Sequence, residues 1–319
     1  MKKTLNIYMK KFNSRICELL DITYPVFQGG MAWVTDPTLA AAVSNAGGLG
    51  ILSAMNADAD FLRSQIAKIR TLTQKPFGVN IMLMSPFVDQ VAQVVIDEKV
   101  PVVTTGAGMP GKYMEGWTQA GLKIIPVVAS VAFAKRLERM GAVAVIAEGA
   151  EAGGHVGDLN TMALIPQVCD ALSIPVIAAG GIADGRGMAA AFMLGAEGVQ
   201  CGTCFLVAEE CNIHPAYKEK IIKAGDTDTI VTGKKLGHPV RALKTPFTRK
   251  FAQMEDSPDV TQQEADEFGA GALRRAVQEG DQQMGCYMAG QSAGLIKKIQ
   301  PAKDIIEDMV NQASVLLKL

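Results

Sequence analysis

Residues 175–205 read PVIAAGGIADGRGMAAAFMLGAEGVQCGTCF. The apolar run at the start of this stretch is typical of a strand buried on both faces of a parallel sheet. Asp184 stands where the N-cap of a helix is expected, ahead of a helix rich in small residues over 187–194. Residues 199–205 then predict a second strand. The stretch is therefore a strand, helix and strand in succession, as parallel α/β folds require.

Glycines stand at the ends of both strands. Gly180 and Gly181 follow the first strand, and the second ends in Gly202 and Thr203. Bare backbone at such positions allows a ligand to approach closely, and the N–H groups at a helix start have no intrahelical partner. Together they predict an anion site, which in a (β/α)8 barrel is the phosphate site of strands 7 and 8. The alternative is two tight turns that bind no ligand. Because both strands end in such glycines, we favour the phosphate site.

Strands and helices alternate along the chain up to the end of this stretch. Roughly eight units follow one another at a spacing of about 25–30 residues, which predicts an α/β fold with a parallel sheet. We expect a closed (β/α)8 TIM barrel with a small α-rich subdomain or lid inserted after strand 8. An open doubly wound sheet is the alternative, but G-x-G-x-x-G is expected after its first strand and none is found there. The expected strands are 25–30, 48–52, 77–83, 100–105, 123–128, 143–147, 176–179 and 199–205.

The strand count is complete near Phe205, although over a hundred residues remain. Within this remainder, residues 225–258 are polar and rich in turn residues. The expected organisation is an N-terminal extension (1–15), the barrel with its cofactor site (16–205), the inserted subdomain (206–280) and C-terminal helices that complete the barrel (281–319). The basic residues of the insertion are Lys234, Lys235, Arg241, Lys244, Arg249 and Lys250.

The bulk composition excludes several classes of protein. The 319 residues carry a formal net charge of −1, so no overall field attracts nucleic acid. Apolar runs are short, and none approaches the roughly 20 residues of a membrane span. The basic start lacks the apolar core of a signal peptide, and six scattered cysteines are consistent with reduced thiols. We therefore expect a cytoplasmic protein.

Cys201 and Cys204 form a C-x-x-C motif. Redox-active pairs of this kind lie at helix N-termini, which stabilise the thiolate. Here both cysteines fall in an expected strand, where positions three apart point to opposite faces. The pair is therefore not expected to act as a redox dithiol.

The carboxyl ends of the strands carry the active site in such barrels. At these ends the chain supplies backbone donors and amides but few charged groups, and it lacks the acidic and histidine cluster of a metal centre. These backbone donors and amides suit a planar organic cofactor that bears a phosphate, and no metal is expected. These strand-end residues are Gln28, Gly29, Gly30, Met31, Asn80, Thr104, Thr105, Gly106, Glu148, Gly153, Gly154, His155, Gly180, Gly181, Gly202 and Thr203.

His155 is the strongest candidate for a catalytic residue. It lies in the Gly-rich segment EGAEAGGHVG (148–157), which we expect to be a mobile loop at the active rim. The near-neutral pKa of histidine suits proton transfer at physiological pH, and the alternative is a structural histidine. His214 precedes a proline at a helix start and is expected to be structural, whereas the role of His238 in the insertion stays open. Glu148 either bonds a cofactor hydroxyl or ring N–H or caps the loop.

Six motifs are more specific together than any one of them. They are FQGGMAWVTDPTLAAAVSNAGGLG (27–50), KPFGVNIMLMSPF (75–87), VVTTGAG (102–108), IAEGAEAGGHVG (146–157), PVIAAGGIADG (175–185) and MAGQSAGL (288–295). With them the chain resembles the enoyl-acyl carrier protein reductase II family, a set of FMN-dependent barrel enzymes similar in fold to nitronate monooxygenases. The resemblance extends over residues 16–295.

The resemblance implies an FMN site and places His155 at the substrate. One departure is Cys204, because family members often carry Arg at this position. An ion pair at this position is therefore in question, whereas the main-chain contacts to the phosphate are not affected. The implied contacts are Gly29, Gly30 and Met31 on FMN, Asn80 and Glu148 toward the ring or ribityl chain, Gly180, Gly181, Gly202 and Thr203 on the phosphate, and Met288, Gly290 and Gln291 closing over the flavin.

The implied activity is reduction of trans-2-enoyl thioesters in fatty acid biosynthesis, with NADH or NADPH as co-substrate. An acyl carrier protein would present the thioester, and the basic residues of the insertion would attract its acidic surface. The resemblance also suggests a monovalent cation held by backbone carbonyls, and a homodimer is expected. Three alternatives stay open: a nitronate monooxygenase in which the same histidine takes a proton, a non-catalytic flavin-binding protein, and a phosphate-site barrel without flavin, such as a nucleotide dehydrogenase.

Overall fold

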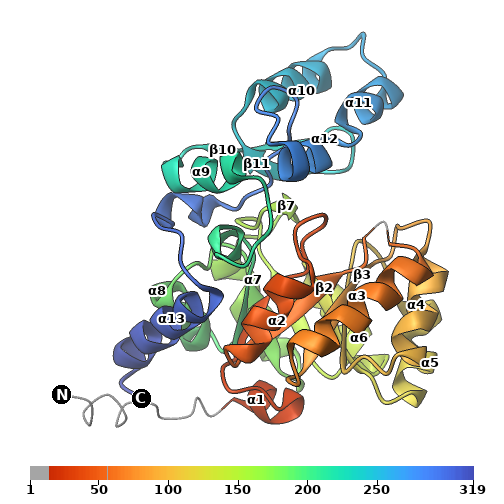
Figure 1. The fold of residues 1–319 in the computed structure, drawn as a ribbon, viewed down its shortest axis with the longest axis vertical. Helices are drawn as coiled ribbons and strands as arrows, with labels where there is room; N and C mark the ends of the chain where they lie inside the picture. Colours follow the sequence, from red (N-terminus) through yellow and green to blue (C-terminus); the bar gives the residue numbers. More distant parts are fainter. Residues whose placement is uncertain (1–13, 56) are drawn as a thin grey trace.

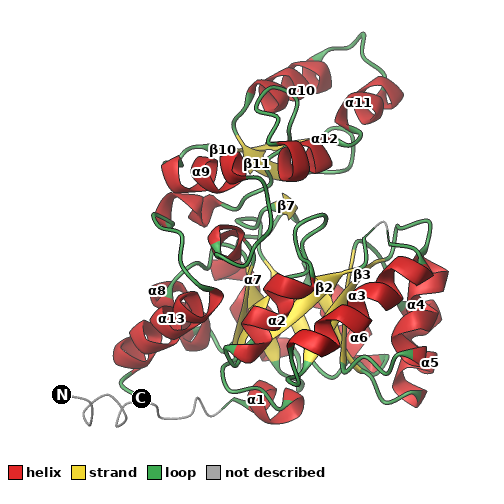
Figure 2. Cartoon of the chain, viewed as in Figure 1, coloured by secondary structure: helices red, strands yellow, loops and turns green. Residues whose placement is uncertain are grey.

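Eight parallel strands close into a barrel in the computed structural model, which describes residues 14–55 and 57–319 (Figure 2). The first strand pairs with its successor on one side and with the last strand on the other, which closes the ring. The predicted (β/α)8 fold is confirmed. The barrel strands are β1 (Val26–Gln28), β2 (Leu49–Ser53), β3 (Phe77–Met82), β4 (Val102–Gly106), β5 (Lys123–Val128), β6 (Val145–Glu148), β8 (Val176–Ala179) and β9 (Gly198–Cys201).

Helices cover the outside of the barrel (Figure 1). Asp184 accepts hydrogen bonds from the N–H groups of Arg186 and Gly187 at 2.9 and 3.3 Å, so it is the N-cap that the sequence predicted. Among residues 14–55 and 57–319, no helix combines the length and the apolar character that a membrane span requires. The outer helices are α2 (Pro37–Asn45), α3 (Ala59–Leu72), α4 (Val88–Asp97), α5 (Gly111–Gln119), α6 (Val131–Arg139), α7 (Thr161–Ala171), α8 (Gly185–Met193) and α13 (Ala302–Leu317).

Large apolar side chains fill the barrel. Phe27, Leu49 and Ile51 belong to this inner cluster, and all three are fully buried. Burial of each such side chain contributes about 1.5–3 kcal/mol. Ile16 of α1 (Arg15–Leu20) joins the same cluster, so α1 covers one end of the barrel (Figure 1). The other end is left for the site.

The subdomain after β9 stands over that other end (Figure 1). Helix α13 follows the subdomain in the chain and packs against α8 and α2. Residues 281–319 thus contain one α-helix, α13, and the short 3-10 helix η4, where C-terminal helices were expected. The proposed boundaries 206–280 and 281–319 stay predictions. The elements between β9 and α13 are η2 (Thr203–Val207), α9 (Pro215–Lys223), β10 (Thr229–Thr232), β11 (Val240–Leu243), α10 (Pro246–Asp256), α11 (Gln262–Gly269), α12 (Ala272–Arg274), η3 (Arg275–Glu279) and η4 (Gln291–Leu295).

A three-stranded sheet corrects the expectation that residues 225–258 are only polar and turn-rich. Strand β10 pairs antiparallel with β11, and β7 (Gly154–His155) adds to the other edge of β11. The β-branched residues of Thr229–Thr232 favour a strand, but the surrounding glycines and charges obscured the pattern. With only two residues, β7 is too short to show any pattern.

The strand expected over 199–205 ends early, at Cys201. The following residues form the 3-10 helix η2, in which the Phe205 N–H donates to the Gly202 carbonyl at 2.9 Å. Phe205 and its neighbours are buried in this helix as they would be in a strand. A short buried apolar run does not distinguish the two structures, which is why the prediction was wrong.

Candidate active site

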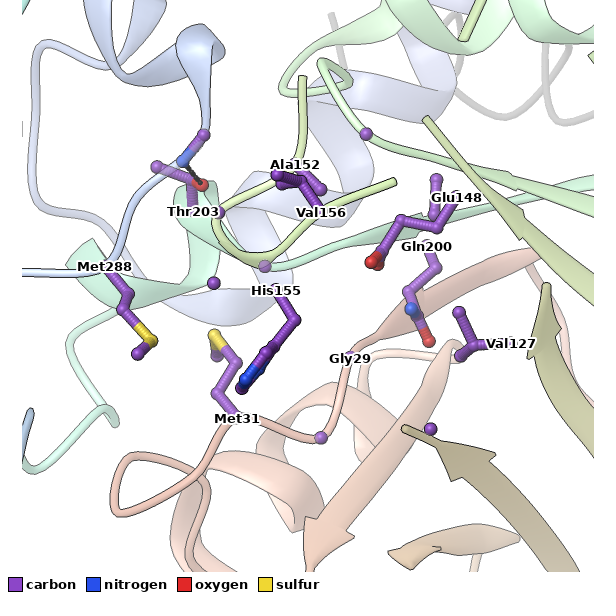
Figure 3. Close-up of a pocket in the computed structure, with 18 of the residues that line it drawn as sticks. Gly29, Met31, Val127, Glu148, Ala152, His155, Val156, Gln200, Thr203 and Met288 are labelled. Atoms are coloured by element: carbon purple, nitrogen blue, oxygen red, sulfur yellow. Dashed lines mark hydrogen bonds between the residues drawn. The ribbon is translucent and has the colours of Figure 1, made fainter. Parts of the chain in front are cut away.

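A cavity of about 500 Å³ lies at the carboxyl ends of the barrel strands, between the barrel and the subdomain. Its volume falls in the range of sites that hold small molecules or cofactors, about 300–1,000 Å³. All eight barrel strands contribute residues at or just after their carboxyl ends, and later parts of the chain contribute Tyr217, Leu273 and Met288. Figure 3 shows Glu148 and Gln200 on one side of this space, and His155, Met31 and Met288 on the other.

The strand-end candidates Gln28, Thr104 and Thr105 do not line the cavity, whereas twelve of the thirteen site residues that the family resemblance implies do. The exception is Gln291, which is exposed and whose N–H donates to the Glu151 carbonyl at 3.0 Å. Its neighbour Ser292 lines the cavity instead. The residues that the structure brings together are Gly29, Gly30, Met31, Asn80, Glu148, His155, Gly180, Gly181, Gly202, Thr203, Met288 and Gly290.

The glycine rim follows β8 and β9. Gly180 and Gly181 have φ angles of +95° and +73°, which other residues rarely adopt. A Cβ on Gly180 would lie 2.7 Å from the carbonyl oxygen of Gly149, so the turn leaves no room for a side chain. Thr203 accepts a hydrogen bond from the Gly290 N–H at 3.0 Å, which joins the rim to the segment that carries Met288. The result is a rim of bare backbone, which suits an anionic group.

The floor of the cavity follows β1. A Cβ on Gly30 would lie 2.4 Å from the Cβ of Asn80, and one on Gly29 would lie 3.1 Å from the Gln200 side chain. The Asn80 Oδ1 accepts a hydrogen bond from Thr104 at 2.9 Å, which leaves the amide NH2 group as the donor toward the cavity. A flat group can therefore approach the main chain closely here and meet amide donors.

Glu148 ends β6 and extends into the cavity (Figure 3). Burial raises the pKa of this carboxyl from 4.5 to about 7. Near neutral pH it is therefore present both as an acid that donates a hydrogen bond and as a carboxylate that accepts one. The alternative that Glu148 caps the loop finds no support, because the loop's hydrogen bonds go to Glu151: the N–H and Oγ1 of Thr161 donate to that carboxylate at 2.9 and 2.8 Å.

His155 lies in β7 rather than in the loop that the sequence suggested. It pairs with Val240 of β11, and its side chain points into the cavity (Figure 3). Burial, and then the nearby His238, lower the pKa of His155. The imidazole is therefore mainly neutral at physiological pH. His238 itself is exposed and does not line the cavity.

His214 has the structural role that the sequence predicted. Its Nδ1 accepts a hydrogen bond from the Ala216 N–H at 3.2 Å and caps α9. The neighbouring Tyr217 was missed, although it lines the cavity and its hydroxyl donates to the Met288 carbonyl at 2.7 Å. Gln200 was also missed, and its polar side chain within a buried strand was the available signal. Both residues shape the cavity through contacts between distant parts of the chain.

Cys201 and Cys204 are both buried, and a hydrogen bond between them together with burial raises the pKa of Cys201 well above its ordinary value. The argument from opposite strand faces was wrong, because Cys204 lies in η2. A raised pKa opposes thiolate formation, so redox activity is still not expected. Within the part of the chain that the structure describes, no three His, Cys, Asp or Glu side chains form a group able to hold a metal.

A closed (β/α)8 barrel with a cavity at the carboxyl ends of its strands has the arrangement of a barrel enzyme. The model of the family described as nitronate monooxygenase matches residues 13–89 and 84–312. The chain therefore belongs to the nitronate monooxygenase family, and it is an oxidoreductase of the flavin-dependent kind.

Similar proteins cover nearly the whole chain. The structure of FabK from Thermotoga maritima is 55% identical, with a TM-score of 0.94 over 96% of this chain and 97% of that chain. A probable nitronate monooxygenase of Staphylococcus aureus is 34% identical over 96% of this chain and 98% of its own length. The (3aS,4S,5R,7aS)-5-hydroxy-7a-methyl-1-oxo-octahydro-1H-indene-4-carboxyl-CoA dehydrogenase of Rhodococcus jostii is also 34% identical, over 96% and 97%. These matches confirm the family resemblance seen in the motifs.

Proposed function

We propose that this protein is an FMN-dependent enoyl-acyl carrier protein reductase that uses NADH or NADPH to reduce trans-2-enoyl thioesters in fatty acid biosynthesis. The observation that carries the proposal is the placement of His155 in the same cavity as the glycine turns that follow β1 and β8. The 55% identity to FabK over almost the whole chain supports the same conclusion. The Rhodococcus relative, whose name specifies a carboxyl-CoA, supports a thioester substrate.

The residues around the cavity fit FMN. Gly180 and Gly181 offer a rim that a Cβ would block, where the phosphate would bind main-chain groups. Gly29 and Gly30 line the cavity with main chain alone, and a planar ring would lie there beside the amide of Asn80. When bound, FMN supplies a two-electron carrier between the nicotinamide and the enoyl substrate. Met288 and Gly290 would cover it from the segment joined to Thr203.

His155 would act on the thioester carbonyl oxygen. The lowered pKa leaves the ring neutral, and a neutral imidazole is a hydrogen-bond donor but a weak acid. We therefore assign it the hydrogen bond to the oxygen on which negative charge develops. Its backbone pairing with Val240 holds the donor in place while that charge forms.

A nitronate monooxygenase is the second candidate, because curated relatives carry that name over 96% of this chain. A neutral His155 also suits the removal of a proton from a substrate carbon. The two reactions are separated by anaerobic oxidation of NADH or NADPH by the purified, FMN-loaded protein with crotonyl-CoA. Turnover that depends on the enoyl thioester supports the reductase. Its absence, together with oxygen-dependent turnover of an alkyl nitronate, would replace the reductase by the oxygenase.

The acyl carrier protein is the proposed partner. Some basic residues of the insertion are already engaged within the protein, which makes them weaker candidates for binding it. Arg241 is half-buried and donates to the Ala150 carbonyl and the Thr229 hydroxyl. Lys235 pairs with Asp256 at 2.6 Å, and Lys250 lies over the Phe268 ring. The exposed residues Lys234, Lys244 and Arg249 are the better candidates for an acidic partner. Cytoplasmic location, the homodimer, the nicotinamide and the monovalent cation stay predictions.

A further inference from the structure

The strand that carries His155 takes its position from the subdomain. In β7, His155 lies opposite Val240 of β11. One residue further on, the Val156 N–H donates to the Pro239 carbonyl at 3.1 Å. The segment leaves the barrel after β6 and returns to it at α7, so this pairing is made far from its two attachment points. The place of the imidazole in the cavity therefore depends on how firmly β7 is held against β11.

Arg241 joins the pieces of this arrangement. Its Nε and Nη2 donate to the carbonyl of Ala150 at 3.2 and 3.0 Å, and its Nη1 donates to the Thr229 Oγ1 at 3.1 Å. Ala150 lies at the base of the His155 segment, where its N–H donates to the Leu159 carbonyl at 2.8 Å. The backbone of Arg241 lies opposite Gly154 in β7. One side chain thus ties β10, β11 and the base of the segment together.

Among residues 14–55 and 57–319, no carboxylate is bonded to this guanidinium. The nearest acidic influence is Glu151, whose carboxylate is already bonded to the N–H and Oγ1 of Thr161. Arg241 is half-buried, and it is not among the residues that line the cavity. Its charge-assisted bonds to a main-chain carbonyl are of the stronger kind, so their loss loosens the base of the segment.

We propose that Arg241 is a positioning residue that sets where His155 lies in the cavity. The inference rests on the proposed function, in which His155 donates a hydrogen bond to the thioester. A misplacement of about 1 Å at a reacting group costs up to about 100-fold in rate. The proposed function gives His155 no role in the step in which the nicotinamide reduces the FMN-loaded enzyme. Loss of Arg241 should therefore slow reoxidation by the enoyl thioester and leave that reductive step unchanged.

The test compares Arg241→Met, which keeps the aliphatic stem, with Arg241→Lys, which keeps one charged donor group. Arg139→Met is the matched control: this exposed arginine on α6 donates to the main-chain carbonyl of Lys135, and it lies near the α6 C-terminus, at the end of the barrel away from the cavity. All three are prepared as FMN-loaded enzymes. Stopped-flow absorbance follows reduction by NADH or NADPH and reoxidation by crotonyl-CoA separately.

We expect Arg241→Met to slow reoxidation by about 10- to 100-fold, with Arg241→Lys between it and the wild type. Reduction should change less than about twofold, and Arg139→Met should match the wild type in both steps. Equal rates in Arg241→Met and wild type would overturn the proposal. So would an equal loss in both steps, since that is what general damage to the fold produces.

Hydrogen exchange gives a readout that does not need turnover. Amide exchange in the peptide that contains residues 152–157 should be about tenfold faster in Arg241→Met than in the wild type. If the wild type does not turn over crotonyl-CoA, the proposed function fails, while faster exchange still supports the role of Arg241. Unchanged exchange overturns that role whatever the substrate. If Arg241→Met does not fold, Arg241→Lys and Thr229→Val, which removes one partner of the guanidinium, carry the same comparison.

Discussion

Glu148→Gln should stabilise the flavin-free protein, and by more as the pH rises. Burial raises the pKa of the Glu148 carboxyl from 4.5, its ordinary value, to about 7. Between these two values the folded protein holds a proton that the unfolded chain has released. Each rise in pH therefore favours the unfolded state through this residue, and the stability present below pH 4.5 is lost progressively up to about pH 7. Gln cannot ionise, so the variant escapes this loss.

The size of the effect follows from the two pKa values. At about 1.4 kcal/mol for each pH unit between them, the full difference is about 3 kcal/mol. This is an upper value, because water in the cavity lowers the desolvation of the carboxylate. Urea unfolding at pH 5, 6, 7 and 8 measures it. The variant should exceed the wild type in free energy of unfolding by less than about 1 kcal/mol at pH 5 and by about 2–3 kcal/mol at pH 8.

Glu115→Gln supplies the control, because this glutamate is exposed on α5. Its difference from the wild type should stay near zero across the same range. A Glu148→Gln difference that is flat from pH 5 to pH 8 would refute the reasoning, and so would one that shrinks with rising pH. Either result would mean that the carboxyl is well solvated or paired in the folded protein.

Three further outcomes follow from the site. His155→Ala should retain FMN, as judged by its absorbance, yet lose about 100-fold in enoyl-dependent kcat; unchanged kcat would favour a non-catalytic role. Gly30→Ala should bind FMN at least about tenfold more weakly in a fluorescence titration, because its Cβ would lie 2.4 Å from the Asn80 Cβ; wild-type affinity would place the ring elsewhere. Cys201 should react with a thiol reagent about 100-fold more slowly in the folded protein than after unfolding, since burial and its bond with Cys204 raise its pKa; fast reaction would indicate an accessible thiolate.

The barrel and its glycine rim were predictable because their signals are local. Gly180 and Gly181 follow a buried apolar run directly, and Asp184 stands three residues further on as an N-cap. The Gly29 and Gly30 pair likewise follows the first strand. In a parallel barrel all strands end on the same face, so such local signals are brought together by the topology alone. The structure gathers them at one cavity.

The rest of the site depends on contacts that no local pattern records. Gln200 faces the cavity only because of the register of β9 against its neighbours, and Tyr217 reaches it from a helix beyond the barrel. Gln291 lies in a motif shared with the family, but the short helix η4 turns its side chain outward. The pairing of His155 with Val240 joins residues 85 positions apart. These placements are set by tertiary packing, which outweighs local preference.

Because β7 pairs with β11, the position of His155 and the binding of the cofactor phosphate depend on different parts of the molecule. The rim that would hold the cofactor phosphate belongs to the barrel, where close packing such as the 2.7 Å approach at Gly180 resists change. The histidine is positioned by the subdomain sheet and by the contacts of Arg241. A change in the subdomain can therefore shift His155 relative to the substrate while the glycine rim that follows β8 stays in place.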